Sequence, residues 1–109
     1  MSFIYLMSPH THPDVEVQQA RYEAALRHAS FWLKEGWNVY SPIVHSHEMH
    51  KLNALPHHRW LEFDFSMLRH AAAGWVLTLE GWQQSKGIEM ERQFCLKAGI
   101  PVKYFDPFL

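Results

Sequence analysis

Residues 74–105 read GWVLTLEGWQQSKGIEMERQFCLKAGIPVKYF, and this stretch predicts the class of fold. Gly74 to Leu79 is a short apolar run, typical of a strand buried on both faces. Gly87 to Ala98 has helical spacing, follows a capping serine at Ser85 and stops at a glycine. Ile100 to Phe105 then gives another strand. A strand, a helix and a strand in this order predict a right-handed crossover between parallel strands.

The remainder of the chain extends this alternation toward the N-terminus. The other predicted elements are a strand at Phe3–Met7, a loop at His10–Asp14, a helix at Val15–Glu35, a strand at Trp37–Tyr40, an irregular loop at Ile43–Pro56, a helix with its inner face from Trp60 to Ala71, and a turn at Glu80–Lys86. The order β-α-β-α-β-α-β is typical of a flavodoxin-like three-layer α/β sandwich with a four-stranded parallel sheet. In such a sheet, ligands bind beyond the carboxyl ends of the strands.

Composition excludes several classes of protein. The chain has 109 residues, which suits one domain over residues 1–109. Its net charge of −1 and lack of a basic run argue against nucleic-acid binding. Its single cysteine, Cys95, cannot form an internal disulfide, which favours the cytoplasm. The longest apolar stretch, Ala71 to Leu79, is shorter than the roughly 20 residues that span a bilayer, and residues 1–7 lack the features of a signal peptide.

Aromatic residues make up 15% of the chain, more than a two-layer core of this size readily hides. Subunit interfaces are rich in aromatic side chains. We therefore expect a homodimer or a higher homo-oligomer.

Two carboxylates fall where apolar residues are expected. Glu91 lies on the helical stripe formed by Ile88 and Cys95, and Asp64 lies on the inward stripe of the preceding helix. A buried carboxylate must find a partner or take a proton. Such a pair suits a site where one carboxylate attacks or stabilises a cationic centre while another group handles protons. Glu91 could instead form a structural ion pair with an arginine (Arg21, Arg27 or Arg92), and Asp64 could bind a helix end or a backbone amide.

The start of the last helix is a candidate anion site. Ser85 and Gly87 place free backbone N–H groups and the positive end of the helix dipole there, although such a serine is usually only a cap. The sequence contains no GxGxxG, no GxxxxGK[ST] and no GxSxG. The sequence therefore has neither the Rossmann dinucleotide fingerprint nor a P-loop, and it has no nucleophile-elbow motif.

Histidines gather in two of the predicted loops. The HSH sequence places His45 and His47 on one side of an extended chain, and His10 and His12 are expected at the same edge of the sheet. Three-ligand zinc sites use such groups, so a metal-dependent hydrolase using His10, His45 and His47 is an alternative. Loop histidines are more often surface groups, and no HExxH motif accompanies them. We expect no bound metal and no cofactor.

Motifs spread over nearly the whole chain match a known pattern. They are Tyr5-Leu6-Met7-Ser8-Pro9, Ser41-Pro42-Ile43, His45-Ser46-His47, Leu55-Pro56, Trp60 with Asp64, Gly81-Trp82, Ser85-x-Gly87-x-x-x-Glu91 and Gly99-Ile100-Pro101-Val102. With these motifs the chain resembles the nucleoside 2-deoxyribosyltransferase-like superfamily, and within it a small bacterial domain family of unknown function.

This resemblance implies cleavage or transfer of an N-glycosidic bond in a nucleoside or nucleotide. In the characterised relatives the motif glutamate, at Glu91 here, attacks the anomeric carbon. Their motif serine and glycine, which correspond to Ser85 and Gly87, hold the sugar phosphate. An aspartate on the preceding helix contacts the sugar or base, as Asp64 would, and Tyr5 matches a first-strand tyrosine that lines the site. Relatives complete their sites across subunits, which again implies a dimer.

The sequence thus predicts Glu91 and Asp64 as catalytic residues and a small-molecule nucleoside or nucleotide as the partner. The expected substrate-binding residues are Tyr5, Ser8, His10, His45, His47, Trp82, Ser85 and Gly87. Trp82, in the turn beside the last helix, could stack on a base or simply lie at a surface or interface. The alternative function is a non-catalytic module that binds a nucleotide-like ligand at the same edge.

Overall fold

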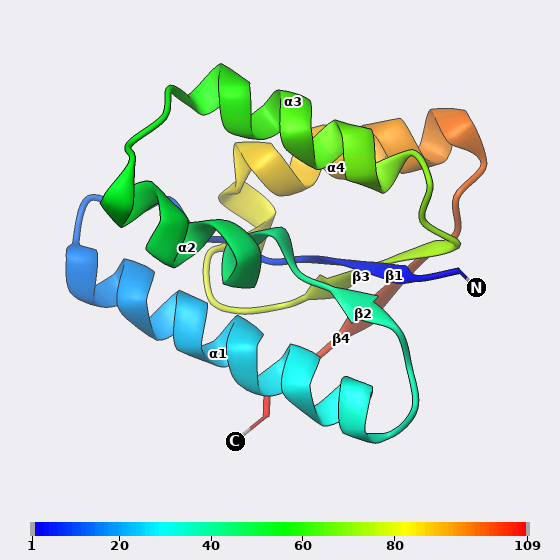
Figure 1. The fold of residues 1–109 in the computed structure, drawn as a ribbon. Helices are drawn as coiled ribbons and strands as arrows, with labels where there is room; N and C mark the ends of the chain where they lie inside the picture. The colour runs from blue at the N-terminus through cyan, green and yellow to red at the C-terminus, as the bar shows by residue number, and fades with distance from the viewer. Residues whose placement is uncertain (1, 109) are drawn as a thin grey trace.

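A computed structural model describes residues 2–108 and places a parallel sheet between two layers of helices (Figure 1). The strands are β1 (Ile4–Met7), β2 (Val39–Tyr40), β3 (Ala73–Leu77) and β4 (Val102–Phe105), in the spatial order β2-β1-β3-β4. The helices are α1 (Val15–Lys34), α2 (Pro42–Leu52), α3 (His57–Leu68), the short 3₁₀ helix η1 (Trp82–Gln84) and α4 (Lys86–Ala98). The predicted four-stranded α/β sandwich is therefore confirmed. No helix within residues 2–108 is long and apolar enough to cross a membrane.

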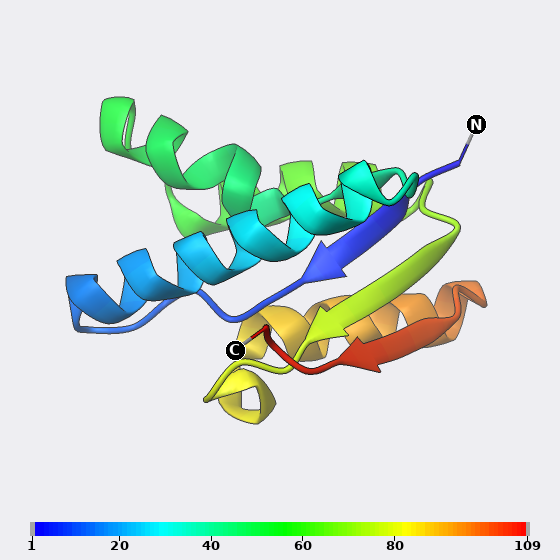
Figure 2. The ribbon, with the colours of Figure 1, turned by 90° about the horizontal axis from the view of Figure 1, so that it is seen from below.

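The two faces of the sheet carry separate apolar cores, because successive strand residues point to opposite sides. One core, under α3 and α4, contains Tyr5, Met7, Leu68, Ala71, Val76, Ile88 and Cys95. The other, under α1, contains Ile4, Leu6, Ala29, Val39, Trp75 and Leu77. Figure 2 shows β1, β3 and β4 running side by side in one direction, with α1 next to β1. The face under α3 and α4 holds the candidate site.

The predicted loop at Ile43–Pro56 is wrong, because Pro42–Leu52 forms helix α2. Ser41 caps this helix by accepting a hydrogen bond from the Val44 amide at 3.1 Å. Pro42 occupies the first turn, where no amide donor is needed. The Ser-Pro pair that closes a strand therefore also begins a helix. The helix follows the carboxyl end of β2 and lies between α1 and α3 (Figure 1).

The predicted turn at Glu80–Lys86 also differs in detail, because it contains η1 at Trp82–Gln84. α4 begins one residue earlier than predicted, at Lys86, and ends as predicted at Gly99, which has a left-handed φ of 72°. The strands are shorter than predicted, and β2 keeps only two residues. These differences leave the predicted strand order along the chain unchanged.

Arg21 joins two loops at the carboxyl edge of the sheet. Its Nη1 donates to the Thr11 carbonyl at 3.0 Å and its Nη2 donates to the Glu80 carbonyl at 3.1 Å. These carbonyls follow β1 and β3, which are neighbours in the sheet. Gly81 has a left-handed φ of 88°, and a Cβ there would lie 2.6 Å from Arg21 Nη2. The guanidinium thus occupies the space that a side chain at Gly81 would need.

We expect Gly81→Ala to lower the free energy of unfolding about 1 kcal/mol more than Gly36→Ala does. Both glycines have left-handed backbone, but a Cβ at Gly36 would meet no atom within 4 Å. The extra loss at Gly81 comes from displacing the Arg21 guanidinium from its carbonyl partners. In an Arg21→Ala background the two glycine substitutions should therefore have similar effects. Urea denaturation of the single and double variants measures this, and additive effects would contradict it.

Candidate functional site

The side chain of Glu91 is buried in the interior and is held by a tyrosine. Only 7% of Glu91 is exposed, as its place on the apolar stripe of α4 predicts. Its carboxyl accepts a short hydrogen bond from the hydroxyl of Tyr5, a fully buried residue of β1. The alternative of a structural ion pair with an arginine is wrong. Within residues 2–108, Arg92 pairs with the exposed Glu89 at 3.1 Å, and no cation pairs with Glu91.

Burial dominates the electrostatics of both inward carboxyls. Desolvation raises the pKa of Glu91 to about 8, although the Tyr5 hydrogen bond opposes this rise. Asp64, half-buried on α3, has its pKa raised to about 7 by desolvation. The charge of Asp64 further raises the pKa of Glu91, which places Asp64 near this carboxyl. Both carboxyls therefore hold protons over part of the neutral pH range.

Tyr40 is a member of this cluster that the sequence did not identify. It is the last residue of β2 and lies in register with Tyr5 on the neighbouring strand, with ring centroids 5.9 Å apart. Burial, and then the charges of Asp64 and Glu91, raise its pKa. Tyr40 stands at the carboxyl end of a predicted strand, directly before Ser41-Pro42, and this position is the signal that could have found it.

Two buried hydroxyls at the carboxyl ends of β1 and β2 lack hydrogen-bond partners in the described part of the chain. One is the Tyr40 hydroxyl, and the other is Ser8 Oγ, which directly follows β1. Ser8 is 7% exposed. Buried polar groups without partners are rare in proteins, and each needs an explanation such as a ligand or a water. The cluster formed by Tyr5, Tyr40, Asp64 and Glu91, with Ser8 at the adjacent strand end, is the candidate site.

The predicted anion-binding residues are both placed at the start of α4. Ser85 caps the helix and accepts a hydrogen bond from the Ile88 amide at 3.3 Å, so its capping role is confirmed. At Gly87, a Cβ would meet nothing closer than Ser85 Oγ at 3.9 Å. Neither packing nor a left-handed backbone requires glycine at this position.

The predicted arrangement of His45 and His47 is wrong because these residues lie on a helix. Two positions apart on a helix, their side chains point in widely different directions. The ring of His45 stacks on Phe63 of α3 at 5.2 Å between centroids. The ring of His47 stacks on Tyr22 of α1 at 4.2 Å. The two imidazoles therefore fix opposite sides of α2 rather than share one ligand.

His10 instead meets His47 in a short hydrogen-bonded chain. His10 Nε2 lies 2.8 Å from His47 Nδ1, and His47 Nε2 lies 3.1 Å from Gln19 Oε1. Because the amide oxygen can only accept, His47 carries its proton on Nε2, and His10 Nε2 must donate to His47 Nδ1. Burial first, then the charges of His47 and Arg21, lower the pKa of His10 to about 4. Burial likewise lowers the pKa of His47, so both rings are neutral at pH 7.

Across residues 2–108, no three His, Cys, Asp or Glu side chains converge as metal ligands. His12 is also engaged locally, because its Nδ1 accepts a hydrogen bond from the Asp14 amide at 3.0 Å. A metal centre built from His10, His45 and His47 is therefore not supported.

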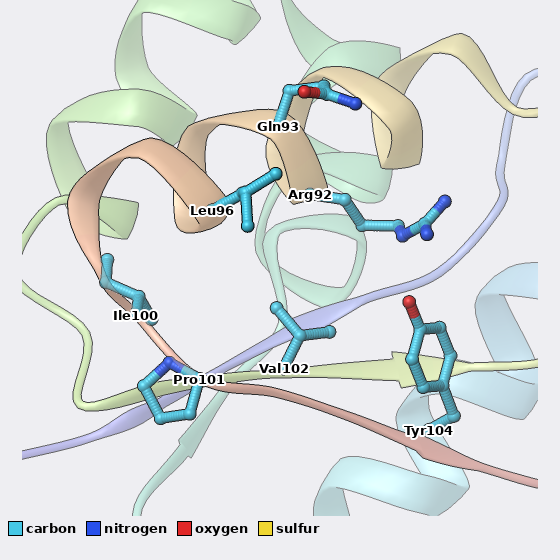
Figure 3. A pocket seen from close by; sticks show the side chains of 7 residues that line it. All are labelled: Arg92, Gln93, Leu96, Ile100, Pro101, Val102 and Tyr104. Carbon is cyan, nitrogen blue, oxygen red and sulfur yellow. The ribbon is translucent and has the colours of Figure 1, made fainter.

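Trp82 faces the flank of the molecule formed by α4 and β4. Its ring lies 5.5 Å from the ring of Tyr104, and the Arg92 guanidinium lies 5.9 Å from its centroid. Beside these residues is a pocket of about 320 Å³, whose lining side chains are shown in Figure 3. They are Arg92, Gln93, Leu96, Ile100, Pro101, Val102 and Tyr104. A second, apolar pocket of about 350 Å³ lies where α2 ends and α3 begins. Neither of these two pockets is lined by Glu91 or Asp64.

Together the fold and the site define a three-layer α/β domain. On the face of its parallel sheet that α3 and α4 cover, a tyrosine donates a hydrogen bond to a buried carboxyl group. The chain belongs to the family described as a domain of unknown function (DUF1937), whose family model matches residues 2–106. This confirms the predicted membership of a small uncharacterised family. No curated protein matches the sequence.

Proposed function

We propose that this protein cleaves or transfers the N-glycosidic bond of a nucleoside or nucleotide, with Glu91 as the nucleophile. The observation that carries the proposal is the buried Glu91 carboxyl, held by Tyr5 beside Asp64 with no cation paired to it in the described chain. A carboxylate without a protein cation suits a ligand that develops positive charge, and the glycosyl transition state does so. The resemblance to the nucleoside 2-deoxyribosyltransferase-like superfamily supports the same roles for Tyr5, Asp64 and Glu91.

In the proposed reaction, Glu91 attacks the anomeric carbon and the bond from that carbon to the base nitrogen breaks. The electron pair of the broken bond stays on the base, which takes a proton from Asp64. Tyr5 keeps its hydrogen bond to Glu91 and so orients the attacking oxygen. Water or an acceptor then attacks the glycosyl-Glu91 ester and returns a proton to Asp64. The active form therefore has Glu91 ionised and Asp64 protonated, which gives a bell-shaped dependence of turnover on pH. This form is the minority among singly protonated molecules, because the pKa of Glu91, about 8, lies above that of Asp64, about 7.

The start of α4 has room for a phosphate group of the proposed substrate. Gly87 leaves space that neither the helix nor the core requires, and the amides there favour an anion. Binding at this position would recruit Ser85 and Gly87 as proposed ligands of a 5′-phosphate. The aromatic content of 15% and the resemblance support the proposed homo-oligomer.

A screen of purified protein against nucleosides and 5′-monophosphates tests the function. Chromatography should detect free base, and mass spectrometry should detect a glycosyl adduct on Glu91. The second candidate, a non-catalytic binding module, is favoured by the pKa of Glu91, which keeps this carboxyl largely protonated at pH 7. A binding module would show ligand-dependent thermal stabilisation without base release or adduct.

A further inference from the structure

Two tyrosines stand side by side in the candidate site, but only one has a partner. Tyr5 and Tyr40 are paired in register on adjacent parallel strands, and both contribute to the core beneath α3 and α4. The Tyr5 hydroxyl donates to Glu91. The Tyr40 hydroxyl is buried and has no hydrogen-bond partner within the described chain.

The environment of Tyr40 favours a ligand hydroxyl as the missing partner. Both Asp64 and Glu91 lie close enough to raise the pKa of Tyr40, and no cation there would stabilise a phenolate. The phenol therefore stays protonated and keeps its capacity to donate one hydrogen bond and accept others. A neutral group with both capacities pairs well with a hydroxyl, which also donates and accepts.

The position of Tyr40 beside Tyr5 indicates which ligand atom it meets. In the proposed reaction, the carboxyl bound by Tyr5 attacks the anomeric carbon of the sugar. The polar substituent nearest to that carbon, apart from the ring oxygen and the base, is the hydroxyl on carbon 2. The Tyr40 ring, 5.9 Å from the Tyr5 ring, is the neighbouring polar group on the sheet.

We propose that the Tyr40 hydroxyl binds the 2-hydroxyl of the sugar, so that the site prefers ribosyl over 2-deoxyribosyl ligands. This inference rests on the proposed function and names its substrate class. A 2-deoxyribosyl ligand would fill the site but leave the buried Tyr40 hydroxyl without a partner. Sites built to bind a hydroxyl discriminate strongly against analogues that lack it, for this reason.

Matched pairs of substrates test the preference. The four ribonucleosides and their 2′-deoxy counterparts are compared as substrates of the wild type and of Tyr40→Phe. We expect the wild type to favour the ribosyl member of an accepted pair in kcat/KM by about tenfold or more. Tyr40→Phe should bring that ratio close to one, mainly by lowering kcat/KM for the ribosyl substrate. A wild-type preference for 2-deoxyribosyl substrates, or an unchanged ratio in Tyr40→Phe, would overturn the proposal.

Tyr5→Phe is the matched control, because it removes a hydroxyl from the same face at the paired position. Tyr5 acts through Glu91 on every substrate, so Tyr5→Phe should lower kcat/KM for both members of a pair by a similar factor. Thermal melting distinguishes a structural role of the Tyr40 hydroxyl from a role in ligand binding. Tyr40→Phe should not lower the melting temperature, because the hydroxyl it removes has no partner. A clear fall in the melting temperature of Tyr40→Phe would reveal a structural partner and overturn the proposal.

Binding measurements distinguish failure of this inference from failure of the proposed function. If no nucleoside is cleaved, the N-glycosidic reaction fails, and the same pairs are compared as ligands by calorimetry. Tighter wild-type binding of the ribosyl member, lost in Tyr40→Phe, would still support the role of Tyr40. Binding of neither member, or equal binding of both, would overturn it.

Discussion

Replacing Glu91 with Gln is expected to reduce turnover at least about a thousandfold, because the amide cannot form the glycosyl ester. The fold should survive, because glutamine has nearly the same shape and can still accept a hydrogen bond from Tyr5. At pH 8 the variant should even be somewhat more stable than the wild type, because it buries no ionisable group. Steady-state assays and urea denaturation, performed on the same preparations, measure the two effects.

Glu89→Gln is the control for this substitution. Glu89 lies on the same helix, but its side chain is 55% exposed and bonds to Arg92 and Gln93. Its replacement should leave turnover within a small factor of the wild type. If Glu91→Gln released free base at the wild-type rate, Glu91 would not be the nucleophile. If Glu89→Gln lost as much turnover as Glu91→Gln, the loss would reflect the helix and not the buried carboxyl.

The stability of the protein is expected to rise by about 1–2 kcal/mol as the pH falls from 8 to 6.5. Glu91 has an ordinary pKa of 4.5 and a folded pKa of about 8, so over this range the folded chain binds a proton that the unfolded chain does not. Asp64, raised to about 7, adds to this effect near the lower end. Stability present at low pH is therefore lost as the pH rises through the folded pKa values. Urea denaturation at several pH values measures the slope.

Histidines set the lower limit of this pH window. The pKa values of His10, His28 and His47 are lowered in the fold. When the pH falls below the ordinary value of 6.5, the unfolded chain binds protons that the folded chain does not, so the free energy of unfolding decreases. Stability should consequently reach a maximum near pH 6 to 6.5. Most of the rise between pH 8 and 6.5 should disappear in Glu91→Gln and persist in Glu89→Gln. A flat wild-type profile would contradict the burial of Glu91 as an uncharged group.

The sequence predicts the sheet and the buried carboxyls well, because both leave a periodic signal. The alternation of apolar runs with glycine-terminated helices identifies the strands, and the place of Glu91 between Ile88 and Cys95 identifies an inward side chain. Helix α2 was missed because Pro42 closes a strand and begins a helix with the same local signal. The wrong prediction that His45 and His47 lie on one side of the chain follows directly from that error, because it assumed an extended loop.

Contacts between distant residues leave no periodic signal. A tyrosine within a strand has the pattern of an ordinary core residue. Periodicity therefore identified neither Tyr5, which only the family resemblance indicated, nor Tyr40. The register of β1 with β2 places the two tyrosines side by side, and that register is not encoded in either strand alone. The pairing of His10 with His47, 37 positions apart, arises in the same way from the approach of α2 to the loop after β1.

The burial of Glu91, which raises its pKa against the opposing effect of the Tyr5 hydrogen bond, also determines how the site interacts with small molecules. At neutral pH most molecules hold Glu91 in its uncharged form, so the resting site offers little attraction to stray metal ions or amines. A ligand that requires the carboxylate must first displace a proton into the solvent. Below pH 8, the apparent dissociation constant of such a ligand then increases about tenfold for each unit by which the pH falls. If Glu91 is the nucleophile that we propose, the affinity for a substrate that requires its charged form should therefore depend on pH.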